Sequence, residues 1–269
     1  VSDQHTTDGS GTGTFTSSIT GLFPNTTYYV RAYVTNSNGT SYSSTKTFKT
    51  KWEPVGYING EFSISPTQKV YFSQGNLQYQ ASTDTWKFAD NQWTYIGEDN
   101  ANISSTYNGW IDLFGWGSGN NPTNASSSNT TFFEWGNNSI TNGGNMYNLW
   151  RTLSEEEWGY VLNTRITNSN IRYAKAIVNG VKGVILLPDN WIENIYNLSN
   201  TNNAEVDFGS NIIDIGTWTN MFEMNGAVFL PSAGWRMGSS ILDIGSCGYY
   251  WSSTKLSSNN VKISFCSSF

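Results

Sequence analysis

The sequence predicts a β-rich α+β fold that follows a shorter, all-β segment. Short runs of alternating apolar and polar residues occur along most of the 269 residues, separated by turn signals rich in Gly, Asn and Ser. Only one stretch, which begins at Ser154, carries a well-marked helix start. Aromatic residues make up 15% of the chain and charged residues 13%, so the chain can bury a large core and disorder is not expected. Many short strands with one helix define the expected class.

Charge and apolar content argue against two classes of partner. The chain has 14 Lys and Arg against 20 Asp and Glu, a net charge of −6, and no basic run. We therefore expect no nucleic-acid partner. No apolar stretch approaches the ~18 residues of a membrane span, so no membrane-spanning segment is expected in this sequence. The one histidine, His5, lies in a Thr-, Gly- and Ser-rich stretch, which argues against a His-based zinc site or a Ser-His-Asp triad.

Residues 1–50 are expected to form β structure. Residues 14–20 alternate weakly, whereas residues 28–34 alternate clearly. The second run predicts a strand with one common face that carries Tyr28, Val30, Ala32 and Val34. Residues 36–39 (Asn-Ser-Asn-Gly) are a turn signal, and residues 41–50 are a further candidate strand.

A more specific pattern lies across the start of that strand. Its members stand at steps of two: Leu22, Pro24, Thr26, Tyr28 and Val30. They resemble the tyrosine corner of a fibronectin type III domain, in which a Tyr hydroxyl bonds to nearby backbone. Such sandwiches need about 90–100 residues. The resemblance thus implies that residues 1–50 are the C-terminal strands of a partial domain, followed by a linker at residues 51–56.

The remaining residues, 57–269, are expected to form the α+β domain. The candidate strands are residues 62–65, 70–73, 86–89, 174–178, 184–187, 227–230 and 261–265. Residues 97–109 and 117–130 are polar loops, and the run between them, 109–117, is too apolar for a free loop and should be buried. Residues 188–191 (Pro-Asp-Asn-Trp) are expected to open a short helix.

The best-marked element is a helix over residues 155–163. Ser154 is a good N-cap and Glu157 completes a capping box, while Leu153 and Trp158 occupy the two positions of a hydrophobic staple. Trp158 should therefore be buried. The acidic run at residues 155–157 could also be a catalytic or cation-binding cluster, but capping and the helix dipole explain its spacing.

Three motifs in this second part resemble known families. Residues 151–158 (Arg-Thr-Leu-Ser-Glu-Glu-Glu-Trp) resemble the Arg-Leu-Pro-Thr-x-x-Glu-Trp segment of formylglycine-generating-enzyme-like domains, which have a C-type lectin fold. Residues 229–236 and 248–254 look like the Fibrobacter succinogenes major paralogous domain, a relative in which a fibronectin-type module often comes first. The resemblance covers residues 57–269. It implies a C-type lectin-like domain of an extracellular or bacterial cell-surface protein, truncated before its closing strand, with a signal or anchor upstream.

The chain departs from the enzymes of this group. Formylglycine-generating enzymes use a Cys pair and ergothioneine-synthase relatives a His/Glu iron site. Here Cys247 and Cys266 lie 19 residues apart outside any matching motif, and His5 belongs to the other part. The Leu-Pro-Asp run at residues 187–189 lacks the first ligand of calcium-dependent lectins. We therefore expect neither enzymatic activity nor a cofactor or metal.

The two cysteines leave three interpretations open: unpaired structural thiols, a disulfide, or redox-active thiols. A symmetric hairpin would place Cys247 opposite Cys266, close enough for a bridge. That register sets Trp251 beside Lys262, whereas a shift by one residue would match Trp251 with an apolar partner and separate the thiols.

The expected ligand-binding site is the turn of this hairpin. Most tryptophans stand in apolar context and are expected in the core, so the candidate residues are polar: Lys255, Ser257, Ser258, Asn259 and Asn260, flanked by Arg236 and Tyr250. Tyr250 could equally point inward. The loops at residues 97–109 and 117–130 are the next candidates.

The function that follows is a non-enzymatic recognition module for a protein or glycan ligand. A structural stalk or adhesin spacer and a formylglycine-generating-type enzyme are the alternatives. Related lectin-like domains also serve as variable targets of diversity-generating retroelements. The Ser- and Asn-rich residues 252–260 fit such a diversified protein and an ordinary loop equally well.

Overall fold

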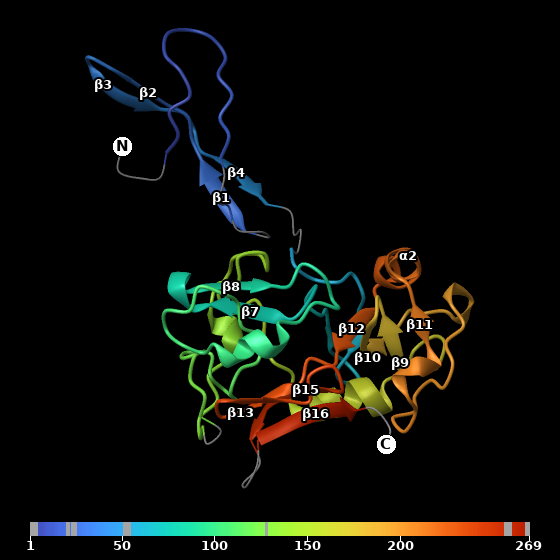
Figure 1. Ribbon diagram of the computed structural model, residues 1–269. Coiled ribbons are helices and arrows are strands. Elements are labelled where there is room, and N and C mark those ends of the chain that lie inside the picture. The colour runs from blue at the N-terminus through green and yellow to red at the C-terminus, as the bar shows by residue number, and fades with distance from the viewer. Residues whose placement is uncertain are drawn as a thin grey trace. The chain divides into compact units, whose positions relative to one another are not determined.

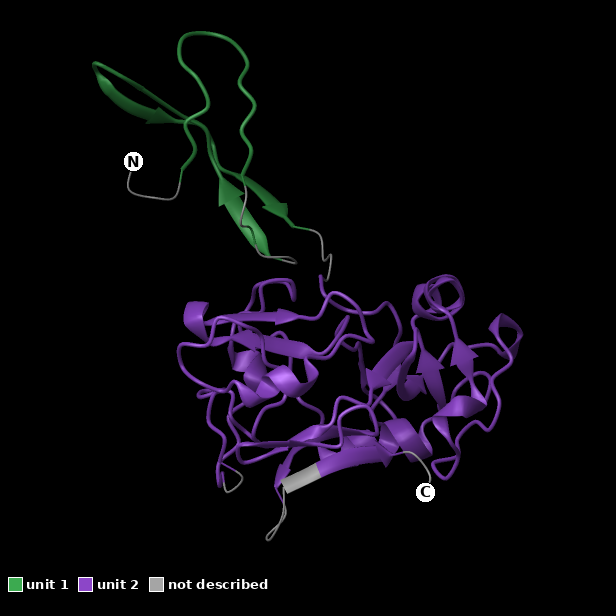
Figure 2. Cartoon of the chain, in the orientation of Figure 1, with its two compact units in different colours: residues 1–54 green, residues 55–269 purple. Residues whose placement is uncertain are grey.

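Two units divide the chain, a small all-β unit at residues 1–54 and a larger unit at residues 55–269 (Figure 2). The structure, a computed structural model, describes residues 5–19, 22, 26–50, 55–126, 129–255 and 260–266. The larger unit is β-rich with few helices, as expected for the β-rich α+β class.

The smaller unit contains two pairs of antiparallel strands (Figure 1). β1 pairs with β4, and β2 pairs with β3. The bounds are β1 (Thr27–Val30), β2 (Tyr33–Asn36), β3 (Gly39–Tyr42) and β4 (Lys46–Lys49). The turn expected at residues 36–39 is confirmed, since Asn36 pairs with Gly39 around a two-residue loop. Within the tyrosine-corner pattern, Pro24 lies outside the described residues and Tyr28 stacks on Phe48.

The prediction of a single strand over residues 28–34 is wrong, because the strand pairing is interrupted at Ala32, between β1 and β2. There the Ser43 hydroxyl accepts a hydrogen bond from the Ala32 N–H at 3.0 Å. The interruption shifts the alternation by one residue, so Val34 is 62% exposed while Tyr33 is half-buried. The same interruption divides residues 41–50 between β3 and β4.

The strands of the larger unit are short, with the longest at its C-terminal end. Their bounds are β5 (Phe62–Ser63), β6 (Lys69–Val70), β7 (Leu77–Gln80), β8 (Thr85–Phe88), β9 (Tyr173–Val178), β10 (Val181–Leu186), β11 (Ile212–Ile213), β12 (Val228–Pro231), β13 (Trp235–Met237), β14 (Ser240–Leu242), β15 (Cys247–Lys255) and β16 (Asn260–Cys266). The helices are α1 (Glu155–Gly159) and α2 (Ile215–Thr217). Single helical turns are η1 (Ala81–Thr83), η2 (Gly97–Ala101), η3 (Trp135–Asn137), η4 (Tyr160–Thr164), η5 (Glu193–Ile195), η6 (Phe208–Ser210), η7 (Trp218–Phe222) and η8 (Glu223–Asn225).

A four-stranded sheet in the order β11-β9-β10-β12 organises this unit. β9 and β10 form a hairpin whose two turn residues, Asn179 and Gly180, both have positive φ (46° and 80°), as a tight hairpin turn requires. Side chains alternate between two faces, so that Ile185 faces one core cluster and Val184 and Leu186 face another. Both faces of the sheet are thus covered.

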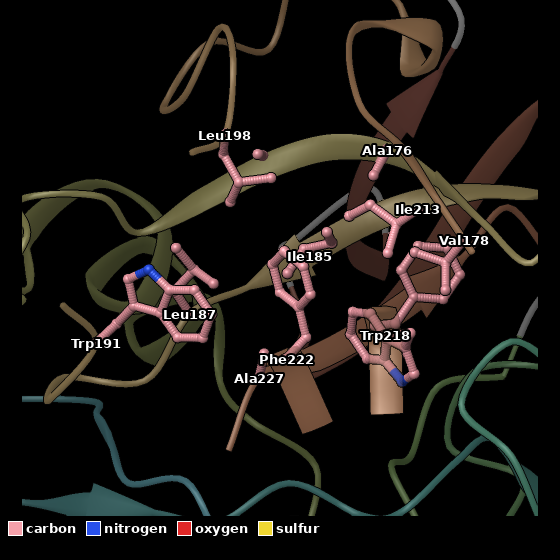
Figure 3. Packing of buried hydrophobic residues seen from close by; sticks show 12 residues of the cluster. Ala176, Val178, Ile185, Leu187, Trp191, Leu198, Ile213, Trp218, Phe222 and Ala227 are labelled. Carbon is pink, nitrogen blue, oxygen red and sulfur yellow. The ribbon is translucent and has the colours of Figure 1, made fainter. Parts of the chain in front are cut away.

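The first cluster lies under the helical segment from α2 to η8. Trp218 and Trp191 each stack on Phe222, with ring centroids 5.4 and 5.3 Å apart, and all three are fully buried (Figure 3). This helical segment was not among the predicted elements. Gly, Thr and Asn near its start are poor helix formers, and the Asp214 N-cap, which accepts from Thr217 N–H at 2.9 Å, was the available signal.

The prediction that residues 188–191 open a short helix is wrong. Those residues form a turn instead, because Asp189 is held by a buried arginine, Arg165, at 3.1 Å and by the Ser63 hydroxyl at 2.6 Å. Trp191 meanwhile points into the first core cluster. Tertiary contacts therefore override the local signal of Pro188.

The second cluster packs α1 and the terminal hairpin against the other face of the sheet. The expected helix is confirmed as α1 and its π-helical continuation η4, and Trp158 is only 5% exposed. The capping box is complete: Ser154 Oγ accepts from Glu157 N–H at 3.2 Å, and the Glu157 carboxylate accepts from Ser154 N–H at 2.8 Å. Arg151 also pairs with Glu157, and its hydrogen bonds hold the pKa of that carboxyl below its ordinary value.

Removing this cap should measurably weaken the unit. We expect Ser154→Ala to lower the free energy of unfolding by ~0.5–2 kcal/mol, because the Glu157 N–H loses its side-chain acceptor. Urea unfolding followed by tryptophan fluorescence measures the change. Ser104→Ala, at an exposed serine, is the control and should leave the urea midpoint in place. Equal midpoints for both variants would contradict the capping role.

The third cluster is built on β7, β8 and the apolar run at residues 109–117. That run is buried, as expected: Ile111, Phe114 and Trp116 are all at most 7% exposed. Gly117 has a φ of +61°, and a Cβ there would lie 2.7 Å from the Cα of Phe132, so only glycine fits. β7 pairs with β8 through Tyr79 opposite Trp86 and was not predicted, because its sequence Leu-Gln-Tyr-Gln carries only a short apolar signal.

Candidate binding surface

The C-terminal hairpin β15–β16 lies against α1 in the larger unit (Figure 1). Of the two registers considered, the structure has the symmetric one, in which Cys247 stands opposite Cys266. The two cysteines form a disulfide, with Cα atoms 4.1 Å apart. Side-chain and backbone hydrogen bonds join the hairpin to the helix start, among them Thr254 Oγ1 accepting from Glu155 N–H at 3.0 Å.

One face of the hairpin belongs to the core. Tyr250, Ile263 and Phe265 pack against the second cluster, and the Tyr250 hydroxyl donates to the Pro231 carbonyl at 3.0 Å. Burial raises the pKa of Tyr250 well above its ordinary value. Tyr250 therefore has the inward orientation that the sequence left open, and its assignment as a flanking ligand residue is corrected to a packing role.

The prediction that Arg236 flanks the ligand-binding site is also wrong. Its side chain is buried, with the residue only 4% exposed, and Nε donates to the Leu113 carbonyl at 2.8 Å while Nη2 donates to the Asn100 carbonyl. These bonds attach β13 to η2 and to the apolar run at residues 109–117. Arg236 thus positions a loop and does not face a ligand.

The polar tip itself is only partly described. Residues 256–259, among them Ser257, Ser258 and Asn259, lie outside the described residues, and Asn260 is described only as the first residue of β16. Lys255 is exposed at the end of β15, and its Nζ donates to the Thr130 carbonyl at 3.0 Å. The assignment of this tip as a binding site stays a prediction.

The other face of the hairpin carries a cluster that the sequence analysis did not select. We call it the aromatic patch; its members are half-buried aromatic rings with a lysine and an aspartate: Trp235, Asp243, Tyr249, Trp251 and Lys262. Trp251 also packs against the third core cluster, and its Nε1 donates to the Phe114 carbonyl at 2.9 Å. Lys262 Nζ lies 3.5 Å from the ring centroid of Trp235 and 4.2 Å from that of Tyr249. Cation–π attraction of this kind contributes about 0.5–2 kcal/mol at partly desolvated sites.

Asp243 closes the patch with two hydrogen bonds. Its Oδ2 accepts from Trp235 Nε1 at 2.9 Å and from the Tyr249 hydroxyl at 3.1 Å. Burial and the bond to Asp243 raise the pKa of Tyr249, and partial burial lowers the pKa of Lys262. The ring orientations are therefore held before any ligand arrives, and preorganised Trp and Tyr side chains are typical of binding hot spots.

A signal for the patch was present in the sequence. The symmetric register sets Trp251 opposite Lys262, and this pairing looked unfavourable because it places an aromatic residue beside a charge. In the structure Lys262 Nζ is 5.9 Å from the Trp251 centroid and lies over the two other rings. Cation–π contact turns the apparent mismatch into a stabilising cross-strand pair.

Two further observations concern the described part of the chain. No helix there is both long and apolar enough to span a bilayer. No three or more His, Cys, Asp or Glu side chains among those residues gather closely enough to hold a metal ion.

Comparison of the sequence and the structure with protein-family models, curated proteins and solved structures finds no match.

Proposed function

We propose that this chain is a non-enzymatic recognition module that binds a protein or glycan ligand through the aromatic patch. The observation that carries the proposal is the constellation beside the hairpin, in which Lys262 lies over two half-buried rings, Trp235 and Tyr249, and Asp243 accepts a hydrogen bond from each of them. Aromatic residues together with a cation and a carboxylate supply apolar area and directional hydrogen bonds to one ligand. The rings lie on strands that are fixed by a disulfide and by the core.

The finer fold assignments are part of the same proposal. The motifs at residues 151–158, 229–236 and 248–254 support a C-type lectin-like domain of the Fibrobacter succinogenes major paralogous type, because α1 and residues 231–234 both contact the third motif on β15. The tyrosine-corner pattern supports a partial fibronectin type III domain in the smaller unit. A disulfide is typical of oxidising compartments, which supports an extracellular or cell-surface location.

Recognition is favoured over thiol-based catalysis by the state of the cysteines. Both sulfurs are joined in the bond between Cys247 and Cys266, so no described cysteine offers a free thiolate. The structural spacer remains the competing role. A spacer would not need aromatic side chains held in a half-buried, partly exposed arrangement on one face.

The proposal is tested by screening the purified full chain on glycan and peptide arrays and then measuring the best hit by calorimetry. Trp235→Ala and Lys262→Gln should each weaken binding at least tenfold, as expected for hot-spot positions. Tyr147→Ala is the matched control, because Tyr147 is 70% exposed and lies outside the patch. Thermal unfolding of each variant establishes that it is folded, and Trp235→Phe keeps a ring if the alanine variant unfolds.

The same assay separates the patch from the hairpin tip. Combined replacement of Lys255, Asn259 and Asn260 by alanine should lower affinity at least tenfold if the ligand extends to the tip. Full affinity in folded Trp235 and Lys262 variants, with or without loss in the tip variant, would overturn the patch as the site. The absence of any hit on either array would favour the spacer.

A further inference from the structure

A polar hollow in the larger unit is lined in part by residues of the β7–β8 hairpin, among them Tyr79, Asp84 and Trp86. Its volume is about 310 Å³, at the lower end of small-molecule sites, which range over roughly 300–1,000 Å³. It shares no lining residue with the aromatic patch. The loops at residues 97–109 and 117–130 both contribute, through Ser105 and the stretch 119–123, so the hollow brings together the two loops that ranked next as binding sites.

The lining is rich in amides and contains one carboxylate. Both side-chain hydrogen bonds of Asn138 in the described chain use its Nδ2, which donates to the Gly119 and Trp135 carbonyls at 2.8 and 3.0 Å. Its Oδ1 is thus left to accept from a ligand. Asp84 Oδ1 accepts from the Tyr79 hydroxyl at 3.0 Å, while no described bond occupies Oδ2. Asn120, which is exposed, adds another donor and acceptor.

The walls of the hollow are rigid. Tyr79 and Trp86 pack against each other with centroids 4.7 Å apart and are 7% and 3% exposed, so they offer little ring surface to a ligand. Trp86 also pairs with Ile140 in a β-bridge, which fixes the segment that carries Asn138. Asp84 is held at a φ of +47°, a conformation that Asp and Asn tolerate better than most residues. Polar groups fixed in advance lose little entropy when a ligand binds.

We propose that this hollow binds a neutral saccharide unit. Amide and carboxylate oxygens accept from sugar hydroxyls, and amide nitrogens donate to them, so an uncharged polyol matches the lining. An anionic ligand would meet the Asp84 carboxylate without a compensating cation in the lining, in a chain of net charge −6. A divalent cation would find a single carboxylate, and an apolar ligand would leave the amides unpaired. This second site goes beyond the proposed role of the patch and does not depend on it.

The test uses saturation-transfer NMR of the full chain with a panel of glucose, galactose, mannose and N-acetylglucosamine, with sialic acid as the anionic comparison. At least one neutral sugar should show saturation, and sialic acid should not. Asp84→Asn keeps the backbone conformation but replaces one acceptor by a donor, and Asn120→Ala removes an exposed amide. Each should raise the dissociation constant of the responding sugar at least tenfold.

The controls make the result decisive. Asp90→Asn changes an exposed carboxylate outside the lining and should bind the sugar as the parent does. Trp235→Ala should also leave sugar binding at the hollow unchanged, which separates this site from the patch. No response from any neutral sugar, a stronger response from sialic acid, or equal affinity in folded Asp84→Asn and Asn120→Ala variants would overturn the proposal.

Discussion

Arg165→Met is expected to lower the free energy of unfolding of the larger unit by about 3–5 kcal/mol. The Arg165 side chain is fully buried, and Nη1 lies 3.1 Å from Asp189 Oδ1. Nη2 donates to the Leu187 and Arg172 carbonyls and Nε to the Val161 carbonyl. Burial lowers the pKa of Arg165 to about 10, so the guanidinium is still charged at neutral pH. Methionine fills part of the volume but removes the guanidinium that neutralises Asp189 and donates to three carbonyls.

The matched control is another arginine that also pairs with a carboxylate. Arg151 binds Glu157 at 2.6 Å, but its side chain is 47% exposed, so Arg151→Met should cost only about 0–1 kcal/mol. Urea unfolding of both variants, together with Asp189→Asn and the double variant, gives the coupling between Arg165 and Asp189. Similar small losses for Arg165→Met and Arg151→Met would contradict the role assigned to the buried pair.

Removing the disulfide is expected to cost about 3 kcal/mol in the double variant Cys247→Ser, Cys266→Ser. The bond joins residues 19 positions apart at the open end of the β15–β16 hairpin. Without it the unfolded chain gains conformations, while the native ladder keeps the same cross-strand pairs. Thermal unfolding of the parent with and without reductant should reproduce the difference, and the double variant should not respond to reductant.

Two further measurements test the chemistry of the bond. Mass spectrometry after alkylation in denaturant without reductant should find no modified thiol in the parent. Stoichiometric alkylation would show free cysteines and would contradict the expected stability loss. Oxygen consumption with a thiol peptide, present in the parent and absent in the variant, would contradict the non-enzymatic function.

Elements with strong local signals could be predicted from the sequence. The capping box at Ser154 and Glu157 marks α1, and short runs made mostly of apolar residues mark β9, β10 and β12. β11 could not be predicted, because two residues that pair in parallel with β9 carry no periodicity. The helical segment at residues 215–225 owes its stability to Trp218 and Phe222 in the core rather than to helix propensity.

The candidate site was harder to predict, because the orientation of its side chains depends on contacts with residues far away in the sequence. Arg236 follows a Gly-Trp pair that looks like a surface turn, and its acceptors at Asn100 and Leu113 are more than a hundred positions away. Which face of a hairpin points outward depends on register, and the register depends on what the opposite strand buries. Tyr250 and Trp251 are equally aromatic, yet only one of them faces the patch. Local sequence alone therefore does not distinguish them.

The contacts between the apolar run at 109–117 and the terminal hairpin set the order in which the unit can be completed during synthesis. Trp116 Nε1 donates to the Ser252 carbonyl, and Trp251 Nε1 donates back to the Phe114 carbonyl, each at 2.9 Å. These partners are separated by more than 130 positions, so the ribosome must extend the chain past Ser252 before either bond can form. Until then the aromatic residues around β7 and β8 lack one of their covering side chains, Trp251. The hairpin β15–β16 thus closes an aromatic core whose other members are translated much earlier, and that core is completed only after the hairpin has been synthesised.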